Sequence, residues 1–280
     1  MADDKPKPSL SALGTVPLIP ISNRERTLKM CIWGNVGAGK TPLAATMPGK
    51  KLWLNFDPDG DSTITHRDDV MVVDFSKEDP QYVEKFRDPN PMNIGKLMEQ
   101  NGINSCVFDS ATAFSMNALQ YGVEHASKMR QHRDATLEDP GYGGYGRRKV
   151  WTTLAVQNVL RECNRRKIHF CVVSHEDTPD KDNEGQIVNI TMMLGSDLAE
   201  KVGLQISEIW HLRDTGDKRI ISLRPFGRRK PIRTRMFDTE KVSQIEWKYD
   251  IDVADDKQPE HTIAGWYARW QKNKYEKIKP

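Results

Sequence analysis

Cysteine is scarce in this sequence, and its scarcity argues against two kinds of small scaffold, those held by disulfides and those held by zinc. The 280 residues include four cysteines, Cys31, Cys106, Cys163 and Cys171, and no two of them form a C-x-x-C pair. Structural zinc sites commonly use such pairs, and disulfide frameworks are typical of short, cysteine-rich secreted chains, so both are the weaker alternatives here. We therefore expect four reduced, buried thiols and a cytoplasmic location.

Long apolar runs and a charge excess are absent too. No stretch approaches the ~18 consecutive apolar residues of a membrane span, and Met1–Pro6 lacks the apolar core of a signal peptide. We expect a soluble protein with no membrane partner. Lysine and arginine number 42 against 39 acidic residues, a formal net charge of +3. This balance excludes a histone-like polycation and an acidic disordered chain, but it permits a locally basic surface.

The chain begins with a proline-containing segment and continues as alternating strand and helix patterns. Residues 1–26 contain four prolines and are predicted to form an extended N-terminal arm. Strands are predicted at 28–33, 51–56, 70–75, 105–108 and 169–173, with helices at 43–47, 91–100, 111–129 and 150–166. Several strands are continuous apolar runs, which is typical of strands covered on both faces. The pattern predicts an α/β fold with a mostly parallel central sheet flanked by helices.

Two later strands are predicted to form an antiparallel hairpin that extends this sheet. They span 207–212 and 219–223, and the turn residues Asp214-Thr215-Gly216-Asp217 lie between them.

A phosphate-binding loop follows the first strand. The segment Gly34-Asn35-Val36-Gly37-Ala38-Gly39-Lys40-Thr41 matches G-x-x-x-x-G-K-[ST] in full. Its glycines let backbone N–H groups wrap a polyphosphate, and the following helix start favours negative charge. Lys40 would reach the β- and γ-phosphates and Thr41 would bind Mg²⁺, so ATP and Mg²⁺ are the expected ligands.

Three further strand ends supply polar residues for the same edge of the sheet. Asp109 closes the fourth strand and is the expected second magnesium-side group. Asp57 and Asp59 follow the second strand, and we expect Asp59, ahead of Asp57, to orient the attacking water. His175 follows the fifth strand and is a candidate contact to the γ-phosphate. Each of these residues also has a purely structural alternative. Asp109 could simply cap the next helix, the Asp57–Asp59 segment could be a polar turn, and His175 could be a solvated loop residue.

These motifs, in this order, resemble the RecA-like P-loop ATPases, and more narrowly the small phage-encoded members that include single-strand-annealing proteins. The resemblance covers residues 27–236, the expected ATPase core. It implies that Asp59 takes the place of the family's catalytic glutamate, although aspartate is one methylene shorter. It also implies that Asp109-Ser110 is the magnesium-side motif and that Ser174-His175 is the γ-phosphate sensor.

The resemblance further implies two DNA-binding loops. The first falls at 139–149, where glycines would give mobility, two tyrosines could stack on bases and three cations could meet phosphates. The candidate DNA-binding residues there are Tyr142, Tyr145, Arg147, Arg148 and Lys149. A flexible surface loop that caps the next helix is the alternative. The second loop would span 178–196, and the acidity of its first half argues against strong phosphate contact.

A basic segment at 224–235 carries six cations within twelve residues. In oligomeric members of the family, a cation from the next subunit reaches the γ-phosphate. Lys230, Arg233 and Arg235 best resemble that motif. A nucleic-acid-binding patch and a solvated face are the alternatives.

The C-terminal tail, 237–280, ends in a predicted amphipathic helix. Ile263, Trp266, Tyr267 and Trp270 follow i, i+3, i+4, i+7 spacing and form an apolar stripe. This stripe could pack on the chain's own core or dock on a partner or neighbouring subunit.

The resulting functional prediction is an Mg²⁺-dependent ATPase of phage type that binds single-stranded DNA in recombination or strand annealing. If a phage encodes it, the location is the host cytoplasm. ATP at the interfaces of a homo-oligomer, either ring or filament, would control DNA affinity. The alternative is a helicase loader or replication-accessory ATPase acting mainly through protein partners. A single-strand-binding protein and a helicase are candidate partners.

Overall fold

The computed structural model describes residues 12–13, 16–18, 20–21, 25–128, 135–194 and 198–279. Most of the expected N-terminal arm lies outside these residues. Its described part contains two short strands, β1 (Ala12–Leu13) and β2 (Val16–Pro17), which pair antiparallel. No helix in the described part of the chain is long and apolar enough to cross a membrane. All four cysteines are buried free thiols, as expected.

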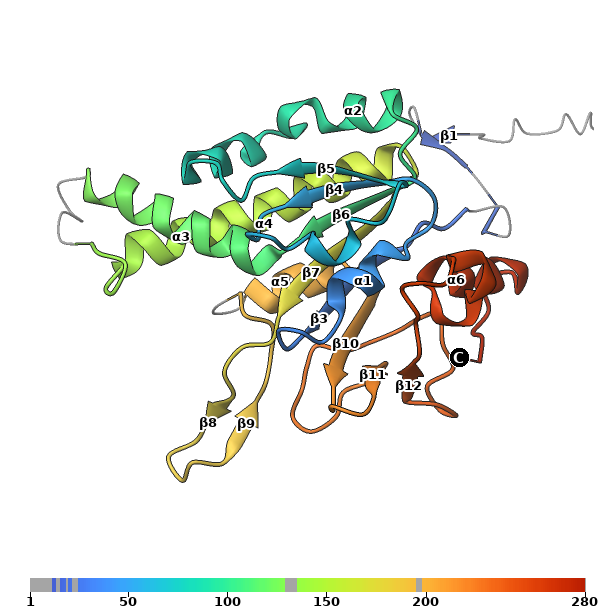
Figure 1. Ribbon diagram of the computed structural model, residues 1–280. Helices are drawn as coiled ribbons and strands as arrows, with labels where there is room; N and C mark the ends of the chain where they lie inside the picture. The colour runs from blue at the N-terminus through green and yellow to red at the C-terminus, as the bar shows by residue number, and fades with distance from the viewer. Residues whose placement is uncertain are drawn as a thin grey trace, which may run out of the picture.

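One eight-stranded sheet organises the fold (Figure 1). Its strands are β3 (Lys29–Gly34), β4 (Lys51–Asn55), β5 (Val70–Asp74), β6 (Ser105–Asp109), β7 (His169–His175), β10 (Glu208–Asp214), β11 (Arg219–Ser222) and β12 (Gln244–Trp247). Their order across the sheet is β12-β11-β10-β3-β7-β6-β4-β5. The six strands from β10 to β5 are parallel, whereas β11 and β12 are antiparallel additions. The predicted α/β class and the β10–β11 hairpin are confirmed.

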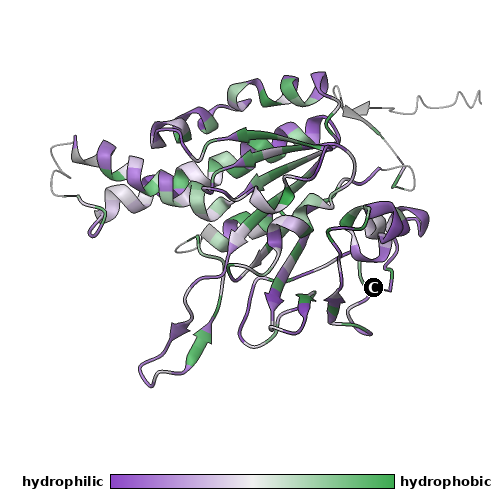
Figure 2. Ribbon diagram, viewed as in Figure 1, coloured by the Kyte–Doolittle hydropathy of each residue, from purple (hydrophilic) through white to green (hydrophobic). Residues whose placement is uncertain are grey.

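Helices cover both faces of this sheet (Figure 1). The α-helices are α1 (Lys40–Ala45), α2 (Ile94–Gln100), α3 (Ala111–Ser127), α4 (Gly141–Arg165), α5 (Leu198–Leu204) and α6 (Ile263–Lys272). Short 3₁₀ helices are η2 (Ser62–Ile64), η3 (Pro80–Arg87), η4 (Pro91–Asn93), η6 (Asp255–Lys257) and η7 (Pro259–His261). One buried cluster contains α2 to α5 residues and the other contains α1 and α6 residues. The sheet therefore separates two cores, and its central parallel strands are largely apolar, whereas the antiparallel edge is more hydrophilic (Figure 2).

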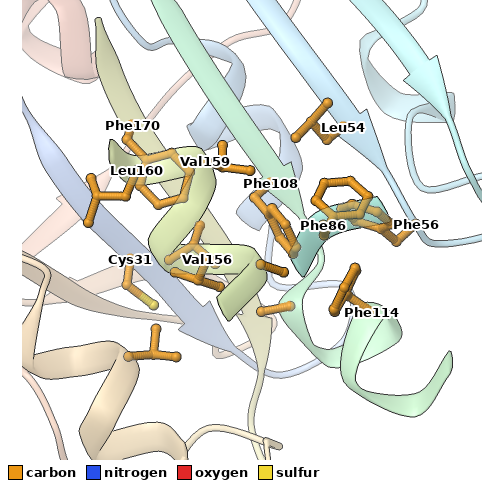
Figure 3. Close-up of a cluster of buried hydrophobic side chains, with 14 of the residues drawn as sticks. Cys31, Leu54, Phe56, Phe86, Phe108, Phe114, Val156, Val159, Leu160 and Phe170 are labelled. Carbon is orange, nitrogen blue, oxygen red and sulfur yellow. The ribbon is translucent and has the colours of Figure 1, made fainter. Parts of the chain in front are cut away.

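The larger core is rich in phenylalanine (Figure 3). The rings of Phe56, Phe86, Phe108 and Phe114 have centroids 4.5–6.2 Å apart. These rings come from the end of β4, from η3, from β6 and from α3. The packing fixes the ends of β4 and β6, where Asp57 and Asp109 are located.

The glycine-rich segment at 139–149 is not the mobile loop that the sequence predicts. Helix α4 begins at Gly141, nine residues before the predicted start of that helix. The glycines allow close packing of α3 on α4: a Cβ on Gly122 would lie 3.2 Å from the Gly144 carbonyl oxygen, and one on Gly144 would lie 3.1 Å from Val123. These glycines thus remove side-chain bulk between two helices, a role that composition alone does not distinguish from mobility.

The second expected DNA-binding loop contains a hairpin. Strands β8 (Asp180–Lys181) and β9 (Ile187–Asn189) pair antiparallel and project from the body of the molecule (Figure 1). The apolar side chains of Ile187 and Val188 are exposed on this hairpin.

The aromatic stripe of the C-terminal helix packs on the chain's own core. Trp266 is buried against Trp210 and Phe237, with ring centroids 5.6 and 5.7 Å away. The N–H of Ile263, at the start of α6, donates to the Thr46 hydroxyl at the end of α1, at 2.9 Å. Of the two interpretations of the stripe, the structure supports packing within the chain and not docking on a partner. The tail thereby supports the helix that follows the phosphate loop.

Candidate nucleotide-binding site

The phosphate loop connects β3 to α1, as the motif predicts. Gly37 and Gly39 have φ angles of 78° and 93°, a region that favours glycine. Gly34 is needed for a different reason: a Cβ there would lie 1.8 Å from the Leu212 carbonyl oxygen of β10. The glycine pattern therefore reflects both backbone conformation and the close approach of a neighbouring strand.

The side chain of Lys40 turns back into this loop. Its Nζ donates to the carbonyl oxygens of Gly34 at 3.1 Å and Asn35 at 2.7 Å, and the residue is buried. Burial lowers the pKa of Lys40 to about 8, while the negative charges of Asp109 and Asp57 act in the opposite direction. A buried ammonium group inside a loop of backbone amides is suited to bind polyphosphate oxygens.

Thr41 and Asp109 lie in direct contact. The Thr41 hydroxyl donates to Oδ2 of Asp109 at 2.9 Å. Asp109 is buried at the end of β6, and burial, together with the charge of Asp57, raises its pKa to about 7. Hydroxyl and carboxylate oxygens are ligands that Mg²⁺ accepts, and Mg²⁺ commonly takes only one or two protein ligands beside substrate phosphates. The pair fits a magnesium site of that kind.

The acidic loop after β4 points Asp57, not Asp59, toward this pair. Asp57 is half-buried and electrostatically coupled to both Lys40 and Asp109, whereas the Asp59 side chain is exposed. Burial acts to raise the pKa of Asp57, but the neighbouring His175, Ser110 and Lys40 together lower it, so it is a carboxylate at neutral pH. This placement favours Asp57 over Asp59, and which of the two orients the attacking water stays a prediction. The φ angle of Asp59, 54°, places it in a tight turn whose direction the sequence does not specify.

His175 ends the strand that lies between the phosphate-loop strand and the Asp109 strand. In the β3–β7 register it is paired with Gly34. Its Nε2 lies 3.9 Å from Oδ2 of Asp57, and its backbone N–H donates to the Thr112 hydroxyl at 2.9 Å. The structure thus brings His175, Asp57, Lys40 and Asp109 to one edge of the sheet.

Sequence reasoning missed a buried cluster beside the loop. Glu176 accepts hydrogen bonds from His211 Nε2 at 2.5 Å and from Arg229 Nε at 3.1 Å. Burial lowers the pKa of His211 to about 4 despite the opposing effect of Glu176. Glu176 directly follows His175 at a strand end, and this position could have marked it as part of the site.

The three basic candidates at 224–235 are placed differently. Lys230 and Arg235 are exposed. The guanidinium of Arg233 donates to the carbonyl oxygens of Gly203 and Ile206, near the end of α5, so it is engaged within the chain. These two contacts hold the head group of Arg233 on its own α5, although the residue is exposed, and a contact with a neighbouring subunit stays a prediction for all three cations.

The candidate DNA-binding residues surround a hollow at the start of α4. Its volume is about 640 Å³, and it is lined by Gly141, Tyr142, Tyr145, Gly146, Arg148, Lys149 and Leu194. Tyr142 is 94% exposed and Tyr145 is 53% exposed. Arg148 donates to the Ser115 hydroxyl of α3 at 2.7 Å. Arg147 lines a different, smaller hollow. Four of the five candidates are therefore brought together.

A phosphate loop after one parallel strand, with an acid at the end of a second strand, defines the class of P-loop nucleotide-binding proteins. Residues 26–244 match the AAA domain family, and the chain belongs to that family. It is therefore a P-loop ATPase in the general sense of the family. A search of curated proteins found no match.

Proposed function

We propose that this protein is an Mg²⁺-dependent ATPase that binds single-stranded DNA and acts in phage recombination or strand annealing. One observation carries the proposal: the aromatic and basic hollow at the start of α4 is joined to the magnesium-side acid through one helix. Helix α3 begins two residues after Asp109, and Arg148 of the hollow donates to Ser115 in its first turns.

In the nucleotide site, each group has a proposed task. Residues 34–41 hold the phosphates, with Lys40 at the β- and γ-phosphates. Thr41 and Asp109 hold Mg²⁺, which would neutralise phosphate charge. Asp57 orients the attacking water in place of Asp59, because it faces the site as a carboxylate. His175, beside Asp57, lies where it can sense the γ-phosphate.

In the DNA site, exposed tyrosines would stack on bases and cations would meet backbone phosphates. Tyr142 and Tyr145 supply the rings and Arg148 and Lys149 the charges. The short path from this hollow to Asp109 supports control of DNA affinity by ATP. We propose that ATP lies at the interfaces of a homo-oligomer, with Lys230 or Arg235 as the cation contributed by the next subunit.

The test is binding of a fluorescent single-stranded oligonucleotide with and without ATP, over a range of salt. Tyr142→Ala with Tyr145→Ala should weaken binding at least tenfold, since base–aromatic stacking contributes ~1–3 kcal/mol per base. The matched Phe variants keep both rings and should bind like the wild type. Absence of binding at every salt concentration, including the lowest, would refute the DNA-binding proposal, because phosphate contacts strengthen as salt falls.

The β8–β9 hairpin favours a second candidate function, that of a helicase loader or replication-accessory ATPase. Its acidic first half is unsuited to phosphate contact, whereas exposed Ile187 and Val188 suit a protein partner. Direct binding of a purified replicative helicase, lost in the double variant Ile187→Ser with Val188→Ser, together with weak DNA affinity, would favour this function.

A further inference from the structure

The outer side of the phosphate loop is contacted by two residues from the antiparallel edge of the sheet. A Cβ added to Gly39 would lie 3.1 Å from the Trp247 ring and 3.4 Å from Nε of Arg219. Arg219 begins β11 and is paired in register with Trp247 of β12. Trp247 is the last residue of β12 and lies just beyond the segment that matches the AAA domain family.

Arg219 is held in place on two sides. Its guanidinium carbon lies 5.9 Å from the centroid of the Trp247 ring, and its Nε lies 3.5 Å from Oδ2 of Asp214. The Trp247 indole is itself fixed, because it donates to the carbonyl oxygen of His261 at 2.8 Å and stacks on Tyr249. The Arg219 side chain nevertheless remains 41% exposed. Trp247 and Asp214 thus hold the guanidinium in position, while part of the side chain stays exposed to solvent beside the phosphate loop.

The strand order indicates which part of a nucleotide lies at this position. Asp109 and His175 end β6 and β7, on one side of the phosphate-loop strand β3. Arg219 begins β11, two strands away on the other side. If the γ-phosphate is directed toward Asp109 and His175, the nucleoside end must extend toward β10 and β11.

We propose that Arg219 stacks its guanidinium on the base of the bound nucleotide. The inference rests on the proposed nucleotide site and names the residue that recognises the nucleoside end. A guanidinium is planar and weakly hydrated, so it stacks on aromatic rings, and Trp247 holds it in position for this contact. Lys40 and the loop amides are already placed to bind the phosphates. The base is therefore the part of the nucleotide that remains for Arg219 to contact.

The experiment compares a fluorescently labelled ATP with inorganic tripolyphosphate, which has the phosphates without the base. Direct titration gives the affinity for labelled ATP, and competition gives that for tripolyphosphate. Arg219→Ala should weaken ATP binding about 5- to 30-fold, the range for loss of a ~1–2 kcal/mol cation–π contact. Tripolyphosphate affinity should stay within twofold of the wild type. Arg219→Lys, which keeps the charge but not the plane, should restore only part of the loss.

Lys218→Ala is the matched control, because it removes the same charge one residue earlier and should leave both affinities unchanged. Arg219→Gln removes the guanidinium and its charge, and it serves as the second variant, with the same expected loss of ATP affinity, if Arg219→Ala is unfolded by circular dichroism. Unchanged ATP affinity, or an equal loss for ATP and tripolyphosphate, would overturn the stacking proposal. Failure of the wild type to bind either ligand would instead refute the nucleotide site itself.

Discussion

Glu176 and Arg229, 53 residues apart in the chain, form a two-point ion pair beside the phosphate loop. Nε of Arg229 donates to Oε2 of Glu176 at 3.1 Å, and Nη2 donates to Oε1 at 3.2 Å. The backbone N–H of Glu176 also donates to the Gly34 carbonyl oxygen at 2.9 Å. One residue therefore connects the start of the phosphate loop to the basic segment at 224–235.

Removal of the arginine from this pair should destabilise the protein. In Arg229→Ala, the Glu176 carboxylate would stay buried and its side chain would keep only the hydrogen bond from His211, whose lowered pKa leaves it neutral near pH 7. We expect a loss of ~2–4 kcal/mol in the free energy of unfolding. Urea denaturation followed by circular dichroism measures it. Arg224→Ala removes an exposed cation of the same segment and should change stability by less than ~0.5 kcal/mol.

The same pair predicts coupling between two substitutions. Glu176→Gln removes the charge that Arg229 neutralises, so the double variant should lose clearly less than the sum of the two single variants. Additive losses would contradict a direct interaction between the two side chains.

The two aspartates after β4 should differ sharply in their effect on ATP turnover. Asp57→Asn removes a carboxylate that faces Lys40 and His175, and we expect at least a hundredfold loss of kcat, typical of a lost general base. Asp59→Asn changes an exposed side chain and should cost less than threefold. Phosphate release under saturating ATP measures both. A large loss only in Asp59→Asn would restore the assignment made from the sequence.

The sequence predicted those features that depend on local pattern. The phosphate loop, the strands of the parallel sheet, the Asp109 position and the β10–β11 hairpin each have a motif or a period that identifies them. The choice between Asp57 and Asp59 depends instead on one backbone turn, and the role of Glu176 depends on contacts with residues 35 and 53 positions away. Contacts between residues so far apart in the chain leave no pattern in the local sequence from which they could be predicted.

The glycines of α4 are a second case in which the local sequence does not predict the structure. Gly141, Gly143, Gly144 and Gly146 suggest a loop by composition, because glycine is a poor helix former. The packing of α3 overrides that propensity, and at Gly144 a Cβ would lie 3.1 Å from Val123 of α3, so the close approach of the two helices favours a residue without a Cβ at this position. Tertiary contact thus decided a secondary structure that the sequence predicted wrongly.

Alanine substitutions in this helix should therefore have opposite effects. A Cβ on Gly144 would lie 2.9 Å from Cβ of Pro140, so Gly144→Ala should destabilise by ~1–3 kcal/mol through overpacking. A Cβ on Gly146 would meet no atom within 4 Å, so Gly146→Ala should stabilise by ~0.5–1 kcal/mol. Thermal unfolding of the two variants tests this. Two neutral results would indicate a mobile segment in place of a packed helix.

The contact between α1 and the C-terminal helix should depend on a single hydroxyl. Thr46→Val preserves the shape of the side chain but leaves the buried N–H of Ile263 without its acceptor, which should cost ~1–3 kcal/mol. Thr46→Ser keeps the hydroxyl and should recover most of this stability in urea denaturation. If the serine variant were as unstable as the valine variant, keeping the hydroxyl would have no effect, and the hydrogen bond could not explain the loss of stability.

A buried histidine should make stability depend on pH. His169 accepts a hydrogen bond at Nδ1 from the N–H of Leu28, at 3.0 Å, and burial lowers its pKa to about 4. The unfolded chain, with a pKa near ~6.5, then binds more protons between these two values, so stability is complete above pH ~6.5 and falls as the pH decreases toward 4. This one residue contributes a slope of up to ~1.4 kcal/mol per pH unit. His169→Asn keeps an acceptor but cannot titrate, so urea denaturation between pH 7 and 4.5 should show a shallower decline than the wild type. Equal slopes would mean that His169 is charged in the folded protein.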